Sequence, residues 1–261
     1  MIRKLMLFNI SVVVIVIATS AWAIDVKKDA ALVGLWLFDE GSGTTVKDSS
    51  GNGNDGKING NFKWDTGKFG GAIVSPGAGS IVVPVSASLN KVTKAMTIAA
   101  WFRIDADSDT GIRRQNAYLL EDQSATEPVP DGFSFRIWTS KGISSGAYGK
   151  TKLEKKKWNH VAGTYDGTQI KLYINGVAEK ELLTDAGAAF DGKWSGDIGT
   201  PTDQLQLKYA DETLIGGVDE IMLFSRALSD SEVKELMVGA VPTTAVSPYT
   251  KLASTWAAIK R

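Results

Sequence analysis

The sequence predicts an all-β protein, an antiparallel β-sandwich with one short helix near the C-terminus. Three observations lead to this fold class. Apolar segments are short, rich in Val, Ile, Trp, Tyr and Phe, and bounded by Gly, Asn, Asp and Ser. An Asn-Gly pair at residues 175–176 joins two apolar segments, as in a type I′ hairpin. Strand follows strand with no long helical pattern between, which favours two packed antiparallel sheets.

Residues 1–23 predict a secretory signal peptide. Arg3 and Lys4 precede an almost wholly apolar run from Leu5 to Ala18, and Ala21-Trp22-Ala23 places small residues at the cleavage positions. A transmembrane anchor is the alternative, but the run falls short of the ~20 residues that a bilayer requires. We therefore predict a secreted, extracytoplasmic protein that begins at Ile24. Because the chain contains no cysteine, disulfides, thiolate metal sites and a lipoprotein anchor are excluded.

The mature chain is predicted to form one domain, residues 30–239, in which the main strands follow in sequence order. Each has the β-branched and aromatic content of a strand and ends in turn residues. The predicted strands are Ala31–Phe38, Ser80–Val85, Thr97–Ile104, Asp131–Trp138, Trp158–Tyr165 and Gln169–Ile174.

One helix is predicted after residue 228. Ser229 is an N-cap residue, and Glu232 three positions later completes a capping box. The apolar residues of this segment share one helical face: Val233, Leu236 and Met237. Gly239 ends the helix.

Residues 240–261 form a linker and a tail. Pro242 and Pro248 interrupt regular structure, and Leu252, Trp256 and Ile259 then recur at helical spacing. We predict a short helix that packs on its own domain. A membrane or partner contact is the alternative.

Four segments carry a family resemblance. They are Leu35–Gly43 with Asp48–Asn54, Met96–Phe102, Trp158–Gly167 running into Leu172–Gly176, and Gly216–Ile221 with Ser225–Ser229. In order and spacing, the chain from about Ala31 to Met237 resembles the laminin-G-like (concanavalin A-like lectin/glucanase) jelly-roll domains of exported bacterial proteins. The resemblance implies a jelly roll whose first and last strands lie side by side.

The resemblance also implies a calcium site. Asp39 ends the first predicted strand and Asp219 lies in the last, so adjacent strands would bring their carboxylates together. Two such carboxylates repel unless a positive charge lies between them. In related domains a structural calcium occupies about this place, held by acids and backbone carbonyls. We expect Asp39 and Asp219 to bind calcium, with carbonyls from Phe69-Gly70-Gly71.

A second oxygen-rich loop spans residues 48–56. Asp48, Ser50 and Asn52 alternate along it, which suits a hard cation such as calcium, and a flexible Gly/Asn turn is the alternative. The loop contains G-x-G-x-x-G, but no helix follows, so a dinucleotide site is excluded. Asp105, Asp107 and Asp109 also alternate and are read either as a solvated turn or as a further ion site.

Aromatic residues in polar surroundings indicate where a sugar ring could stack. Trp138 precedes Thr139 and Ser140, and Trp194 lies between Lys193 and Ser195. We predict a glycan site formed by Trp138, Trp194, Tyr148 and Arg136, and purely structural roles are the alternative. The tryptophans inside strand motifs are predicted to pack in the core: Trp36, Trp101 and Trp158.

Catalysis and nucleic-acid binding are not expected. Lys+Arg and Asp+Glu both number 29, so there is no basic surplus for phosphates. His160 is the only histidine, lies within a strand and is predicted to pack. Asp219 and Glu220 are adjacent, which would direct them to opposite faces of a strand rather than form a glycosidase pair.

The sequence therefore predicts an exported, non-catalytic module that binds glycan or another cell-surface ligand, with a structural calcium. Two alternatives remain. One is a structural or adhesive module with a protein partner, and the other is a glycoside hydrolase or polysaccharide lyase.

Overall fold

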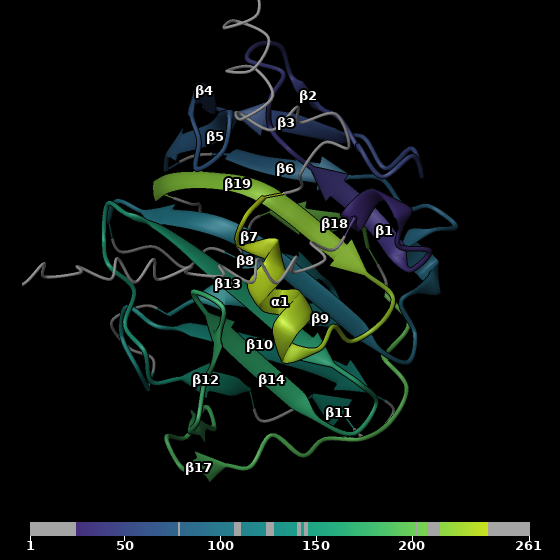
Figure 1. Ribbon diagram of the computed structural model, residues 1–261, viewed down its shortest axis with the longest axis vertical. Coiled ribbons are helices and arrows are strands. Elements are labelled where there is room, and N and C mark those ends of the chain that lie inside the picture. Colours follow the sequence, from purple (N-terminus) through teal and green to yellow (C-terminus); the bar gives the residue numbers. More distant parts are fainter. Residues whose placement is uncertain are drawn as a thin grey trace, which may run out of the picture.

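The computed structural model describes residues 25–239, except residues 78, 107–110, 124–127, 140–141, 144–145, 202 and 208–214. Two antiparallel sheets are packed face to face (Figure 1). The front sheet has the order β15 (Val177–Ala178), β14 (Ile170–Ile174), β13 (Trp158–Tyr165), β7 (Met96–Ile104), β19 (Ile215–Phe224), β5 (Gly71–Pro76), β4 (Lys63–Thr66), with β1 (Leu32–Trp36) also paired to β19.

The back sheet lies behind it in Figure 1. Its order is β17 (Ala189–Phe190), β16 (Leu182–Leu183), β12 (Ala147–Gly149), β10 (Phe133–Thr139), β9 (Tyr118–Asp122), β8 (Gly111–Arg114), β18 (Leu205–Leu207), β6 (Gly79–Val83), β3 (Gly56–Gly60), β2 (Thr45–Val46), with β11 (Gly142–Ile143) also paired to β10. Two 3₁₀ turns, η1 (Val26–Lys28) and η2 (Leu89–Lys91), and one helix, α1 (Asp230–Leu236), complete the described elements.

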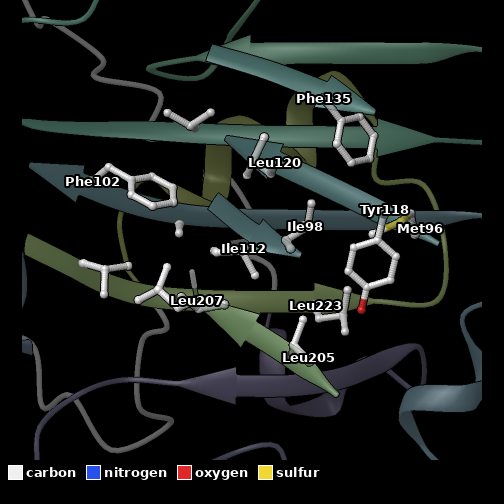
Figure 2. Packing of buried hydrophobic residues seen from close by; sticks show 14 of the residues in the cluster. Met96, Ile98, Phe102, Ile112, Tyr118, Leu120, Phe135, Leu205, Leu207 and Leu223 are labelled. Atoms are coloured by element: carbon white, nitrogen blue, oxygen red, sulfur yellow. The ribbon is translucent and has the colours of Figure 1, made fainter. Parts of the chain in front are cut away.

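The main core fills the space between the sheets. Alternate residues of each strand point into it, and Figure 2 shows side chains from both sheets meeting in one layer. Fully burying one such Leu, Ile or Phe contributes about 1.5–3 kcal/mol. At one point the sheets approach so closely that a Cβ on Gly163 would lie 2.4 Å from the ring of Phe135. A larger residue there would separate the two layers.

The structure confirms the predicted fold class and the six main strands, which are β1, β6, β7, β10, β13 and β14. The Asn175-Gly176 turn has φ values of 48° and 73°, as a type I′ hairpin requires. β1 pairs with β19, so the first and last strands lie side by side as the resemblance implied. The predicted signal peptide and tail helix, and Asp107 and Asp109, lie outside the described residues.

Helix α1 covers the outer face of the front sheet, the face toward the viewer in Figure 1. The capping box is present: the Ser229 hydroxyl accepts from the Glu232 N–H, and the Ser229 N–H donates to the Glu232 carboxylate. Val233 and Leu236 are fully buried in a second, smaller core together with Leu35, Ala99, Ala162, Tyr173, Met222 and Phe224. None of the helices in the described part of the chain has the length and apolar content of a membrane span.

An ion-pair network fixes the start of the domain to this helix. Arg226 Nη2 donates to Asp29 Oδ2 at 2.6 Å and to Glu232 Oε1 at 2.6 Å, and Arg226 Nη1 donates to Glu232 Oε2 at 3.0 Å. The bonds from Arg226 hold the pKa of the Glu232 carboxyl at about 2. Because this pKa is lower than in the unfolded chain, the network stabilises the fold above about pH 4 and loses that effect as the pH falls through about 2.

Glu232→Gln tests this network. Glutamine still accepts the Ser229 N–H of the capping box but removes the charge that faces Arg226. All three charged partners are partly exposed, so we expect a loss of about 1 kcal/mol at pH 7, a decrease in Tm of roughly 2–4 °C. Thermal melts of both proteins should converge as the pH is lowered toward 2. An equal difference at pH 7 and at low pH would show that the charge of Glu232 contributes nothing.

Candidate functional site

The first candidate site lies around the loop Gly67–Gly71, which connects β4 to β5. Asp39 follows β1, and its Oδ1 accepts a hydrogen bond from the Gly71 N–H at 2.7 Å. Asp219 is in β19, and its Oδ2 accepts from the Phe69 N–H at 3.0 Å. The structure therefore brings the two predicted carboxylates to one loop. We call Asp39, Asp219 and Gly67–Gly71 the oxygen cradle.

Glycines allow the oxygens of the cradle to approach the loop backbone. A Cβ on Gly70 would lie 2.2 Å from Asp39 Oδ1, and one on Gly71 would lie 2.5 Å from the Phe38 carbonyl oxygen. A Cβ on Gly67 would lie 2.1 Å from the Gly71 carbonyl oxygen and 2.5 Å from Asp219 Oδ2. Two carboxylate oxygens and the carbonyl oxygens of Phe38 and Gly71 thus lie at the loop backbone. The Gly70 carbonyl, one of the predicted calcium ligands, accepts a hydrogen bond from the Gly67 N–H at 3.1 Å.

Asp219 is the electrostatically strained group of the cradle. Its side chain is 0% exposed, and Oδ1 has no hydrogen-bond partner. Burial, and to a smaller extent the neighbouring Glu220 carboxylate, raise the pKa of this carboxyl to about 7. A buried carboxylate with an unsatisfied oxygen is costly unless a positive partner is present. The cradle is thus chemically suited to a hard cation.

The strand around Asp219 is irregular. The pairing of β19 with β7 shifts register between Asp219 and Met222, and Glu220 has a φ of +51°. This is a β-bulge, so the strict alternation expected for Asp219 and Glu220 does not hold at this point. Bulges redirect side chains, and this one lies next to the buried carboxylate.

The other predicted cation loop is organised differently. Asp48 Oδ1 accepts from the Leu35 and Ser50 N–H groups, and Oδ2 accepts from the Ser50 hydroxyl and the Asn54 N–H, at 2.8–3.0 Å. Asn52 Nδ2 donates to the carbonyl oxygen of Leu32. A carboxylate has about four lone-pair sites, and protein donors occupy those of Asp48. We therefore assign Asp48 and Asn52 a structural role that ties the loop to β1.

A row of buried polar side chains adjoins the cradle. Trp101 on β7 pairs with Asp219 on one side and with His160 on the other. The Trp101 and His160 ring centroids are 5.2 Å apart, and Phe69 and the Lys68 ammonium cover Trp101, the latter 4.5 Å from its ring centroid. Trp101 is buried, as predicted, but it lies under this loop on the outer face of the front sheet rather than between the sheets.

His160 is buried, as predicted. Burial lowers the pKa of its imidazole to about 4. The ring is therefore neutral at pH 7.

The second candidate site lies on the outer face of the back sheet. Along β10, Phe133, Phe135 and Ile137 belong to the main core, so Ser134, Arg136 and Trp138 face the opposite side. Ser134 pairs with Tyr148 of β12 and with Glu121 of β9. Three of the four predicted ligand residues therefore share one face. We call Glu121, Ser134, Arg136, Trp138 and Tyr148 the back-face site.

The polar groups of the back-face site are connected. Arg136 Nη2 lies 3.3 Å from Glu121 Oε1, and the Ser134 hydroxyl donates to the same oxygen at 3.1 Å. The Arg136 guanidinium carbon lies 5.1 Å from the centroid of the Tyr148 ring, a cation–π contact. Tyr148 is 0% exposed, so the prediction that its ring faces a ligand is wrong. It supports Arg136 instead, while Arg136 and Trp138 remain partly exposed.

Trp194 lies outside this face. Its backbone N–H donates to the Thr168 carbonyl, and its side chain packs against the main core. Together with Thr168, Gln169, Lys193 and Ser195 it lines an open groove of ≈ 500 Å³. The segment that follows Trp194 in the chain contacts the back-face site at Gly199, whose N–H donates to the Trp138 carbonyl at 2.8 Å. The two tryptophans therefore flank one segment at the same end of the sandwich.

Glu121 and Ser134 were missed by sequence reasoning. Ser134 lies two residues before Arg136, so alternation on β10 could have identified it. Glu121 comes from another strand, and only the register of β9 against β10 places it beside Arg136.

Comparison with known proteins gives a consistent result. Residues 75–234 match the family described as the concanavalin A-like lectin/glucanases superfamily. No curated protein matches the chain. Among solved structures, one similar protein is domain 4 of AbnA, an extracellular GH43 arabinanase from Geobacillus stearothermophilus, in complex with arabinotriose. Its identity is 22% and its TM-score 0.59, over 79% of this chain and 98% of that domain.

Two toxin domains are also similar in fold. The binding domain of botulinum neurotoxin DC in complex with SialylT has 12% identity and a TM-score of 0.58 over 84% of this chain. The binding domain of Paraclostridial Mosquitocidal Protein 1 has 17% identity and a TM-score of 0.54 over 81%. The chain spans about half the length of each of these, 53% and 52%.

Proposed function

Because the chain belongs to the concanavalin A-like lectin/glucanases superfamily, we propose that it is a non-catalytic module that binds carbohydrate through the back-face site. One observation carries this proposal: Arg136 is held between Glu121 and the Tyr148 ring, next to the partly exposed Trp138. Neighbouring sugar hydroxyls can each donate to a carboxylate and accept from a guanidinium. An aromatic face beside this pair can stack on the sugar ring.

The similar structures support a glycan as ligand. The arabinanase domain is in complex with arabinotriose, and a botulinum binding domain is in complex with SialylT. These are different sugars, so they support the ligand class rather than a particular saccharide. The back-face site itself pairs one cation with one anion, which favours a hydroxyl-rich ligand over a highly charged one.

A binding role is favoured over hydrolysis by the carboxylates of the site. Glycosidases use two carboxyl groups about 5–5.5 Å or 6.5–9.5 Å apart. Within the back-face site as described, Glu121 is the one carboxylate, and it is already engaged by Arg136 and Ser134. This leaves no acid and base pair across a scissile bond.

A glycan array tests the proposal. The mature protein should bind a set of oligosaccharides, and Arg136→Met should lose that binding without unfolding. Incubation with the bound polysaccharide should release no reducing ends or unsaturated products. Product release would establish an enzyme, and capture of a protein partner with no glycan bound would favour the adhesive alternative.

We also propose a structural calcium in the oxygen cradle. The orphan Oδ1 of buried Asp219 and the carbonyl oxygens next to Gly67 and Gly71 supply the kind of oxygen ligands that calcium takes. Asp39 and Asp219 would neutralise its charge, with the Phe38 and Gly71 carbonyls beside them. Bound there, the ion would hold the end of β1 against the Gly67–Gly71 loop.

Export is proposed from residues 1–23, and it yields a direct prediction. Cleavage after Ala23 should leave a mature N-terminus at Ile24. N-terminal sequencing of secreted protein is the measurement. Recovery of intact Met1 in the membrane fraction would instead identify the segment as an anchor.

A further inference from the structure

Three residues that follow one another across three strands of the front sheet each have a buried polar atom without a hydrogen-bond partner. These atoms are Asp219 Oδ1, Trp101 Nε1 and His160 Nδ1. The residues are 0%, 3% and 1% exposed, and the register places them in one row across β19, β7 and β13. Buried polar groups nearly always have partners. Three orphans in one row indicate a shared polar occupant rather than three separate defects.

The ligand count of the oxygen cradle indicates what this occupant is. Calcium takes 6–8 oxygen ligands. Asp39 Oδ1 and Asp219 Oδ2 each already accept a backbone N–H of the loop. Over the described residues, no three His, Asp or Glu side chains gather where they could hold a metal. A cation here would therefore keep water among its ligands.

We propose that Trp101 and His160 hold the water of the cation bound by Asp39 and Asp219. This inference rests on the calcium proposal and adds two positioning residues to it. The indole N–H of Trp101 donates to water oxygen, and the Nδ1 of His160 accepts a water proton. A neutral imidazole is required beside a cation, and burial keeps His160 neutral. An enclosed water is stable when it has two to four polar partners, which the row supplies.

Terbium is the probe, because Tb³⁺ replaces calcium at oxygen sites and emits light when an adjacent tryptophan is excited. The mature protein should give sensitised terbium emission that calcium competes away. Trp101→Phe should lose most of this emission. Emission lifetimes in H₂O and D₂O, which count metal-bound water, should show at least one bound water. That number should fall in His160→Phe and be restored in His160→Gln, whose amide can still bond to water.

Trp158→Phe is the matched control. Trp158 lies two residues before His160 on the same face of β13, roughly 7 Å further along the strand. This variant should retain the emission.

The outcomes separate the two proposals. If terbium and calcium do not bind the wild-type protein, the calcium proposal fails and this inference fails with it. If they bind but the lifetimes show no bound water, or Trp101→Phe emits like wild type, the calcium proposal stands and the roles of Trp101 and His160 are refuted. If a variant does not fold, the wild-type lifetime alone can still refute the inference, by showing no metal-bound water.

Discussion

Asp219→Asn should abolish the stabilisation of the protein by calcium while its metal-free form stays folded. The amide oxygen of asparagine can still accept the Phe69 N–H, but the charge that would bind a cation is lost. A ligand that binds only the native state stabilises it by ~2.7 kcal/mol at a hundredfold excess over Kd. For a domain of this size, that stabilisation raises the Tm by roughly 5–11 °C.

Thermal melts with chelator and with added calcium measure this effect. Wild type should show the full shift, and Asp219→Asn should show none. Asp48→Asn is the matched control, because it removes a carboxylate that makes only protein hydrogen bonds. It should lower both melting curves and keep the difference between them. A wild-type Tm that ignores chelator and calcium alike would sink the calcium proposal.

The contrast between Asp219 and Asp48 shows how far sequence reasoning reaches. The pairing of Asp39 with Asp219 could be predicted, because it follows from which strands are first and last and from their adjacency in the fold. Both readings of the Asp48 loop stayed open in the sequence, because oxygens at alternate positions serve equally well to bind a cation or to accept loop N–H groups. Only the coordinates of the donors distinguish these uses.

Trp101 and His160 mark a second limit. Each lies in a strand whose apolar pattern predicts only that its side chains pack. The proximity of Trp101 and His160 to Asp219 depends on the register of three strands. Register is set by long-range pairing and by the bulge near Glu220, neither of which is visible in local sequence.

The glycan site shows the same division. Arg136 and Trp138 could be predicted together because they are two residues apart on one strand. The burial of Tyr148 depends on what covers the back sheet, and Trp194 depends on how the segment after β17 folds onto the core. Both depend on tertiary packing, so the sequence predicted four equivalent ligand residues. The structure instead leaves Arg136 and Trp138 partly exposed, places Tyr148 as a support for Arg136, and packs Trp194 against the core.

Those roles predict different outcomes for the two tryptophans. Trp138→Ala should weaken glycan binding by roughly 1–3 kcal/mol, by analogy with the stacking of bases on aromatic side chains, which is about 5–150-fold in Kd. Trp138 is partly exposed on the outer face. The free energy of unfolding of the variant should therefore change by no more than about 0.5 kcal/mol, as for other surface substitutions, and its Tm should hardly shift.

Trp194→Ala should instead destabilise the fold, because its ring packs against the main core. Replacing a fully buried tryptophan by alanine lowers the free energy of unfolding by ~3–5 kcal/mol. Because Trp194 is partly exposed, its loss should cost about 3 kcal/mol, the lower end of this range. Titration calorimetry with a glycan identified on the array, together with thermal melts, separates the two effects. If Trp138→Ala binds like wild type while a folded Trp194→Ala loses binding, the ligand lies in the groove beside Lys193 and Gln169, and the back-face site is wrong. If Trp138→Ala alone loses binding at unchanged Tm, the sugar stacks on β10 beside Arg136.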